Sequence, residues 1–426
     1  MKKTLLIFLF AGFLFSCSSE DQSIANSDDV GTYSEFKVTK EELVANVTGF
    51  LNEFYSDNAS TKSSKSKFTI KSIELLTEKD FPQELTKSSG GLEFDSLLYV
   101  VNLDEGFVIA GADKRTAPVF AIIDEGSFSK DILQSENDND APFLAYIDRA
   151  LLIINDDIAD NELYDEKLPS TKAYPIKERV YPLLGRTKWG QSRNPYILYC
   201  PKGTHAGCVI VALAQVSLYY QSPKSVYFGS NIPQNPLGKG FTLNLNWTNI
   251  LNASNRNGGW MPDASFSLTE GFYNESQAVA LYMRYIGEIV GANYTTDGTS
   301  ASFPRAISYM RDRIGLQATD QHEFNRHNLY KQIRGGNFVV LNGCANSSGF
   351  KRTTCHMWLA DGVFVSNHDH HYFHYNWGWS GEHNGFFFED RWNPGKSEFN
   401  DDGSEKPQGD YGKNYKYGLK ASYISW

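Results

Sequence analysis

The sequence has few cysteines, no excess of basic residues and no apolar run long enough for a permanent membrane helix. Five cysteines in 426 residues are too few for a disulfide scaffold, and their spacings contain no CxxC pair, which argues against structural zinc. With 40 Lys and Arg against 50 Asp and Glu, the formal net charge is -10, so we expect no nucleic-acid partner. Aromatic residues are plentiful (28 Phe, 24 Tyr, 8 Trp), and the length allows two domains or more, each with its own core.

The first 17 residues have the pattern of a secretory signal. Lys2 and Lys3 precede a short apolar run, and the tetrad 14–17, Leu-Phe-Ser-Cys, resembles a bacterial lipobox. This predicts an exported chain whose Cys17 carries a lipid anchor, tethered by the polar residues 18–34 to the bacterial outer membrane or cell surface, with release after processing. The alternative is an ordinary cleaved signal in which the cysteine is there by chance.

Residues 35–165 are expected to fold as a small α+β domain. Thr39–Tyr55 has apolar residues at helical spacing, with Thr39 and Glu42 available for a capping box. Ser96–Asn102 and Gly106–Gly111 predict a β-hairpin, and 142–154 predicts a second helix. This part contains neither cysteine nor histidine, so we expect no chemistry in it. By itself this leaves an inhibitory, a chaperoning and a binding role open. The composition of 164–174 indicates an exposed linker.

The stretch Thr204–Pro223 predicts a buried helix with a cysteine in its first turn. Gly207 and Cys208 stand immediately before an apolar run that ends at Pro223. A thiol at a helix N-terminus lies near unpaired backbone N–H groups and the positive end of the helix dipole, which favour the thiolate. Cys208 is therefore a candidate nucleophile. The competing interpretation is a small core residue, which most free cysteines are.

The C-terminal part supplies the groups that a nucleophilic cysteine requires. Helical patterns precede a run of strands from 338 onward, which predicts an α+β layout with an antiparallel sheet. His356 lies in one predicted strand and Asn376 in the next, while Gln191 precedes Cys208. An imidazole that accepts the thiol proton, an amide that orients it and an amide donor for the oxyanion form a set suited to acyl transfer.

These residues lie in blocks that resemble the streptopain family of papain-like cysteine peptidases. The resemblance covers most of 180–390 in the family's order. Its blocks are Trp189-Gly190-Gln191, Gly207-Cys208-Val209, His356-Met357-Trp358 and Asn376-Trp377-Gly378-Trp379. It implies a papain-like catalytic domain at 174–426, polypeptide substrates, and no cofactor or metal.

The resemblance also implies roles for individual residues. Cys208 would be the nucleophile, His356 the general base and acid, Gln191 an oxyanion-hole donor, Asn376 the residue that orients the imidazole, and Trp377 a shield beside it. Residues 99–113 resemble the family's propeptide, so 35–165 would be an inhibitory prosegment, removed by cleavage within 160–180.

The chain departs from the family at one position beside the candidate base. Cys355 stands where a small residue usually precedes the histidine. Because alternate strand residues face opposite sides, its side chain need not enter the cleft. Pairing of Cys355 with Cys344 or Cys200, or a free thiol, all stay open.

The same residues allow other interpretations. His205 could serve as the base, and His368, Asp369, His370, His371 and His374 form a cluster that could bind zinc or copper, although an exposed hairpin explains the cluster better. Asp361 is interpreted as part of a turn rather than as a third catalytic member. The rival functions are a non-catalytic binding or adhesion lipoprotein on the same fold, and a thiol acyl transferase. The main hypothesis is a secreted cysteine endopeptidase made as a zymogen.

Overall fold

The computed structural model describes residues 36–55, 68–81, 96–135, 140–159, 176–268, 273–296, 298–345, 354–366, 370–389 and 419–426. Residues 37–426 form one compact unit. The predicted signal peptide (1–17), tether (18–34) and linker (164–174) lie outside the described residues. Among the helices that are described, none has the length and apolar character needed to cross a membrane.

The N-terminal part, 37–159, contains the helices and strands that its hydrophobic pattern predicts. Its elements are α2 (Lys40–Phe54), β1 (Ile70–Leu76), β2 (Leu98–Leu103), β3 (Phe107–Gly111), β4 (Ala121–Ile123) and α4 (Ala141–Ala159). The capping box of α2 is present, because Glu42 N donates to Thr39 Oγ1 over 3.2 Å and Thr39 N donates to Glu42 Oε2 over 2.9 Å. β2 and β3 pair antiparallel, which confirms the predicted hairpin.

Residues 208–314 form a mostly helical region around α5. Its elements are α5 (Cys208–Tyr220), α6 (Trp247–Arg256), α7 (Glu275–Val290), α8 (Phe303–Tyr309), a π-helical turn (Met310–Ile314), and the hairpins β6 (Ser225–Phe228) with β7 (Phe241–Asn244) and β8 (Asn293–Thr295) with β9 (Gly298–Ser300). α5 is buried almost all round and ends at Gln221 in the left-handed conformation. α6 was not predicted; β7 ends at Asn244, and Trp247 starts the helix.

An antiparallel sheet follows, as the change of period from 338 predicts. Its strands are β5 (Ile176–Val180), β10 (Gln317–Ala318), β11 (His322–Glu323), β12 (Val339–Ala345), β13 (Thr354–Ser366), β14 (His371–Asn376), β15 (Gly385–Phe388) and β16 (Lys420–Ser425), with α9 (Arg326–Arg334) before β12. The strand order β15-β14-β13-β12-β16 places the longest strand, β13, in the interior of the sheet. We call residues 176–426 the C-terminal part.

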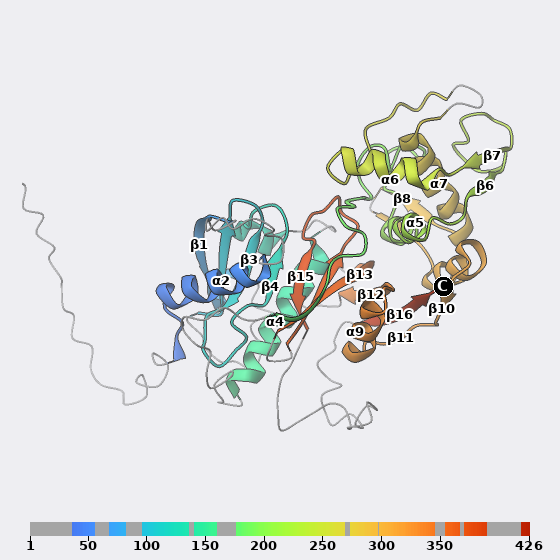
Figure 1. The fold of residues 1–426 in the computed structure, drawn as a ribbon. Helices are drawn as coiled ribbons and strands as arrows, with labels where there is room; N and C mark the ends of the chain where they lie inside the picture. Colours follow the sequence, from blue (N-terminus) through green and yellow to red (C-terminus); the bar gives the residue numbers. More distant parts are fainter. Residues whose placement is uncertain are drawn as a thin grey trace, which may run out of the picture. The chain divides into compact units, whose positions relative to one another are not determined.

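The sheet of the N-terminal part continues into that of the C-terminal part through one pair of strands (Figure 1). β4 pairs antiparallel with β15, with Ile122 opposite Phe386 and Ala121 opposite Phe387. β15 is also covered on both faces, because the ring of Phe386 lies 5.1 Å from that of Phe54 in α2, while the ring of Phe387 lies 4.7 Å from that of Tyr146 in α4. The two parts therefore share a sheet and a core.

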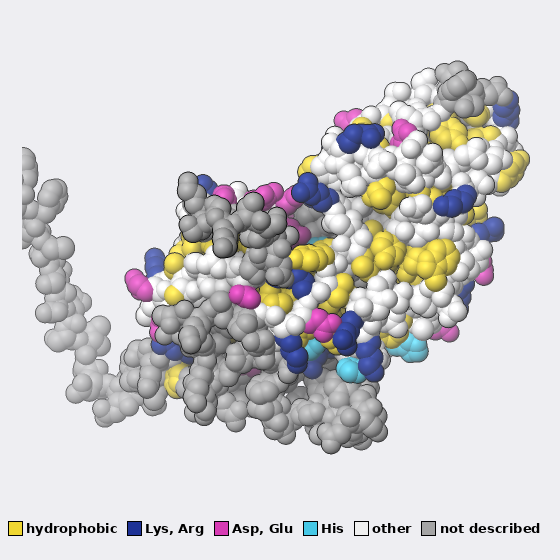
Figure 2. Space-filling model, viewed as in Figure 1, with side chains coloured by type: hydrophobic (Ala, Val, Ile, Leu, Met, Phe, Trp, Pro, Cys, Tyr) yellow, Lys and Arg dark blue, Asp and Glu magenta, His cyan; other side chains and the backbone are white. Residues whose placement is uncertain are grey.

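Two apolar cores lie on either side of β13. Alternate residues of this strand belong to different cores: Trp358 and Ala360 pack with the N-terminal part, whereas Met357 and Leu359 pack with α5 and α7. On the surface shown in Figure 2, basic and acidic side chains of the described residues are interspersed. The period of two along β13 decides which way each side chain of the candidate site points.

Candidate active site

Cys208 is the first residue of α5, as the sequence predicts. The preceding Gly207 has φ 95°, and a Cβ atom there would lie 3.0 Å from the side chain of Thr299, so both backbone conformation and space favour glycine. Hydrogen bonding from Ala206 N to Gln191 O over 2.8 Å places the Gln191 loop beside the start of the helix. Cys208 is half-buried and its thiol is free.

The thiol of Cys208 lies against the strand that carries His356. The backbone N–H of Met357 is directed at its sulfur, together with the N–H groups of Val209 and Cys208 at the start of α5. Burial nevertheless raises the pKa of the Cys208 thiol above its ordinary value, and the three N–H groups offset this only in part. The helix N-terminus thus acts in the predicted direction, but the thiolate is not the favoured form in this arrangement.

His356 lies in β13 with its ring turned toward an aromatic cluster. Its Nε2 donates to the carbonyl of Trp377 over 2.9 Å, and its ring centroid lies 4.4 Å from that of Trp379. Burial lowers the pKa of His356 to about 4, although the Trp377 carbonyl acts against this. The imidazole is therefore neutral at ordinary pH and supplies no positive charge to stabilise a thiolate.

Cys208 and His356 lie in neighbouring segments, and the alternation of side chains along β13 explains why they form no ion pair. His356 is on the same side of the strand as Trp358, in the core shared with the N-terminal part, whereas Met357 is on the side of α5. The alternation along β13 thus turns the His356 ring away from α5. The structure brings the two segments together and leaves the two side chains unpaired.

Asn376 lies on the neighbouring strand β14, as predicted, but its side chain faces α5. It is opposite Leu359 in the register of β13 and β14. Its Oδ1 accepts from Gln215 Nε2 at 3.3 Å and from Gly378 N at 3.1 Å, and its Nδ2 donates to Thr187 O at 3.0 Å. All these partners differ from His356, so in this arrangement Asn376 holds the 187–191 segment and α5 rather than the imidazole.

Trp377 and Gln191 belong to two loops that lie side by side. Ser380 N donates to Trp189 O over 3.3 Å, and Gly190 forms a β-bridge with Trp379. Trp377 is buried, with its Nε1 donating to His383 O over 2.8 Å. The four sequence blocks are therefore gathered around the start of α5 and the adjoining strands β13 and β14.

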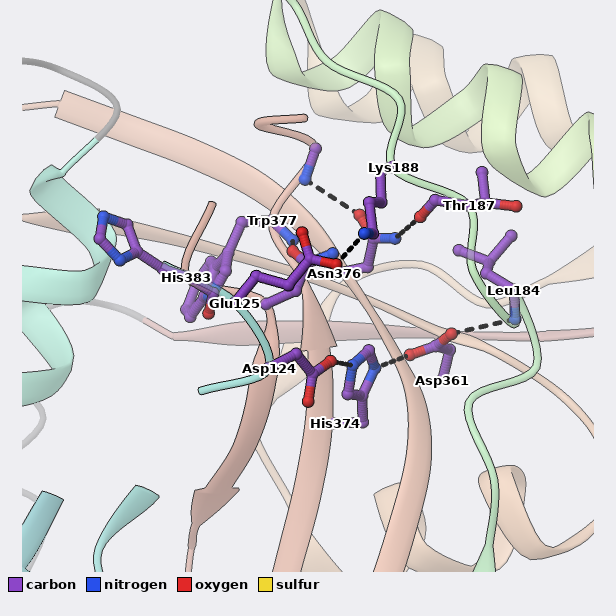
Figure 3. A network of polar contacts seen from close by, with 12 residues as sticks. Asp124, Glu125, Leu184, Thr187, Lys188, Asp361, His374, Asn376, Trp377 and His383 are labelled. Carbon is purple, nitrogen blue, oxygen red and sulfur yellow. Dashed lines mark hydrogen bonds and ion pairs between the residues drawn. The ribbon is translucent and has the colours of Figure 1, made fainter. Parts of the chain in front are cut away.

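Asp361 has a role that the sequence interpretation missed. It lies inside β13, at a bulge between Ala360 and Gly362, and its side chain is fully buried. Its Oδ1 accepts from His374 Nδ1 over 2.5 Å and its Oδ2 from Leu184 N over 3.0 Å, as Figure 3 shows. The turn interpretation was wrong, because Asp361 is the buried anion that holds His374 and the start of the 184–191 segment. An acidic residue inside an apolar strand was the available signal.

The structure also places several of the other histidines and cysteines. Within the part of the chain that is described, no group of three potential metal ligands occurs; His368 and Asp369 lie outside it, and His374 is bound to Asp361. Cys200 is free and buried, and Cys355 is disulfide-bonded. Cys344 is the residue opposite Cys355 in the register of β12 and β13.

Comparison with known proteins relates this region to cysteine peptidases. Residues 189–387 match the model of the Peptidase C10 family. Streptopain of Streptococcus pyogenes is 27% identical over 340 residues, covering 72% of this chain and 77% of the relative. Two solved Prevotella intermedia structures also match. A fragment of prointerpain A has TM-score 0.45 and 18% identity over 78% of this chain and 96% of that one, and active interpain A has TM-score 0.37 and 21% identity over 58% and 95%.

The site and the matches together define the protein class. A cysteine at the start of a buried helix, beside strands that carry histidine and asparagine, belongs to a cysteine-type peptidase of α+β fold. The matches support a streptopain-family cysteine peptidase, with residues 189–387 as the part that matches the C10 family model. The family prediction made from the four blocks is confirmed.

Proposed function

We propose that the chain is a secreted cysteine endopeptidase made as a zymogen, with Cys208 as nucleophile and His356 as general base and acid. The observation that carries this is the contact of the Cys208 sulfur with the N–H of Met357, the residue next to His356. Gln191 and the backbone N–H of Cys208 are the proposed oxyanion donors. Asn376 is the proposed orienting residue and Trp377 the shield.

In the proposed reaction His356 takes the proton of the Cys208 thiol, and the thiolate attacks the carbonyl carbon of the scissile peptide bond. The tetrahedral oxyanion collapses and expels the amine, which takes the proton from His356. A water molecule, deprotonated by His356, then attacks the thioester and releases the carboxylic acid and the free thiol. Each step needs the imidazole within hydrogen-bond reach of the sulfur.

The latent state of the site supports the zymogen proposal. The thiol is held neutral by burial, and the imidazole is neutral and bound to Trp377 O. Trp358, Trp377 and Trp379 around the His356 ring belong to the core that the N-terminal part completes. Removal of the N-terminal part would open this core and let the ring turn toward Cys208, which makes residues 35–165 the proposed inhibitory prosegment and 174–426 the catalytic domain.

Alkylation rates test this mechanism, with Cys200 as the internal control. The full chain is treated with iodoacetamide near pH 6 during the lag before processing, and the processed enzyme is treated in the same way. Cys208 should react roughly a hundredfold faster in the processed enzyme, because there the imidazolium stabilises the thiolate. Cys200 should react slowly in both, since burial raises its pKa to about 12. Mass spectrometry of the modified peptides gives both rates. Equal Cys208 rates in the two forms would contradict a site that is assembled by processing.

Export and anchoring rest on the first 17 residues alone. We propose that Cys17 is lipidated and attaches the precursor to the bacterial outer membrane or cell surface. Metabolic labelling with an alkyne fatty acid should label the wild type and the control Cys200→Ser, and Cys17→Ser should carry no label and leave the membrane fraction. A labelled Cys17→Ser variant would exclude this residue as the anchor.

A further inference from the structure

Three basic side chains of the C-terminal part meet carboxylates of the N-terminal part along the β4–β15 junction. They are His374 in β14, His383 in the turn before β15, and Lys188 in the segment ahead of α5. Figure 3 shows His374 and Lys188 facing the consecutive residues Asp124 and Glu125, directly after β4. Each contact joins residues that lie on opposite sides of the predicted cleavage region.

His374 is held between two carboxylates. Its Nδ1 donates to Asp361 Oδ1 over 2.5 Å and its Nε2 donates to Asp124 Oδ2 over 3.1 Å. Since a carboxylate oxygen accepts at each ring nitrogen, the geometry is that of the imidazolium. Burial alone would lower the pKa of His374, but Asp361 and Asp124 outweigh it and raise the pKa to about 10. Asp361 belongs to the C-terminal part, so only the Asp124 contact is lost when the N-terminal part leaves.

The other two contacts lie on the loops that carry the proposed catalytic machinery. Lys188 forms an ion pair with Glu125 and lies 4.7 Å above the ring of Trp260; it precedes Gln191 by three residues. His383 Nε2 donates to Asp140 Oδ1 over 3.1 Å, and the His383 ring stacks on Phe143 at 4.5 Å. The carbonyl of His383 accepts from Trp377 Nε1. The carboxylates of the N-terminal part therefore hold both the Gln191 loop and the Trp377 loop.

We propose that His374 and Lys188, together with the N–H donor His383, form a receptor that recognises a strand bearing carboxylates, and that its occupant is the N-terminal part through Asp124, Asp140 and Glu125. The proposal rests on the zymogen function proposed above. The receptor would fix the register of β4 along β15, which apolar burial alone does not do. Hydrophobic contacts are not directional, and a shift of the short strand β4 by one residue along β15 would exchange its two faces. Paired charges specify one register and slow the release of the segment.

The charge pattern is not uniform over the whole junction. Arg149 in α4 forms an ion pair of the opposite polarity with the buried Glu389 after β15, and Glu105 of the N-terminal part adds a further negative charge near Lys188. Arg149 and Glu389 are left unchanged in the test, which addresses the three carboxylates alone.

The first experiment compares latency in the full chain carrying Asp124→Asn, Glu125→Gln and Asp140→Asn with a control carrying Glu41→Gln, Glu78→Gln and Asp131→Asn. Both variants change the charge equally, and both give a mature enzyme of wild-type sequence after cleavage within 160–180. We expect the variant that lacks Asp124, Glu125 and Asp140 to shorten the lag before peptide hydrolysis roughly tenfold, equivalent to about 1.4 kcal/mol. Its lag should also lose much of its salt dependence. The control should keep the wild-type lag. Equal lags and salt dependence in the two variants would overturn the receptor.

Exchanging the charges of Lys188 and Glu125 distinguishes a specific ion pair from a general structural role of Lys188. Lys188→Glu should shorten the lag, and adding Glu125→Lys should restore it, because the ion pair is rebuilt with reversed polarity. Both precursors release the same mature enzyme, so its own activity cancels from the comparison. A further shortening of the lag in the double variant would refute the pairing. If the wild-type chain shows no thiol-dependent hydrolysis at all, the enzyme proposal fails before the receptor is tested.

Discussion

Replacing Cys208 with alanine is expected to abolish peptide hydrolysis and leave the full chain unprocessed. Cys208 is the free thiol at the start of α5, beside the strand that carries His356. Without the sulfur no acyl-enzyme forms, so activity on casein should fall by at least about a thousandfold. The wild type should shorten itself by roughly the first 150 to 180 residues, since exposed linkers are the usual cleavage sites.

The matched control is Cys200→Ala, which removes the other free thiol found among the described residues. It should retain thiol-dependent activity, with some loss of stability because Cys200 is buried. Activity is followed with labelled casein, and processing by gel electrophoresis and intact mass. Equal processing of wild type and Cys208→Ala would show that maturation does not depend on this nucleophile. An added amine that appears in the products would identify acyl transfer in place of hydrolysis.

The second large effect is expected on stability, from Asp361→Asn. The Asp361 carboxylate is fully buried and hydrogen-bonded to both His374 Nδ1 and Leu184 N. Asparagine removes the negative charge and leaves a buried imidazolium with Asp124 alone. Breaking a buried pair in this way typically costs about 3–5 kcal/mol. We expect a loss of this size in the free energy of unfolding near pH 6, measured by urea denaturation in the Cys208→Ala background, which prevents self-digestion.

The loss should depend on pH with a definite sign. The pKa of His374 is raised in the folded chain to about 10, above the roughly 6.5 of an unfolded histidine. The stabilisation from its charge is therefore fully present below about pH 6.5 and is lost as the pH rises toward 10. The difference between wild type and Asp361→Asn should shrink over that range. The exposed control Asp131→Asn should stay within about 0.5 kcal/mol of wild type. A loss that does not change with pH would contradict the imidazolium assignment.

Much of the fold follows from local patterns. The capping box of Thr39 and Glu42, the β2–β3 hairpin and the buried helix α5 were all predicted from the sequence and are present. Each has a signal within a few residues: a capping pair, two apolar runs around a turn, or an apolar run that ends before proline. α6 was missed, although Asn246 as N-cap and the spacing of Trp247, Ile250 and Ala253 indicated a helix.

Long-range pairing carries no comparable local signal. β4 is three residues long, and nothing in its sequence specifies β15 as its partner, 264 positions further along for the pair Ile122 and Phe386. The same holds for Asp361 and His374, which meet because β13 and β14 pair with a bulge between Ala360 and Gly362. These contacts depend on the global packing of the sheet and were not predicted.

The sequence by itself indicated the protein class and the candidate groups of the site, because Cys208, His356, Asn376 and Gln191 stand in blocks that resemble those of the family and follow its order. Only the tertiary structure decided what state those groups are in. The pKa of a side chain depends on burial and on neighbouring charges, and these come from segments distant in the chain. The face of β13 on which His356 lies, and the shared core that surrounds it, make the imidazole neutral and turn it from the sulfur.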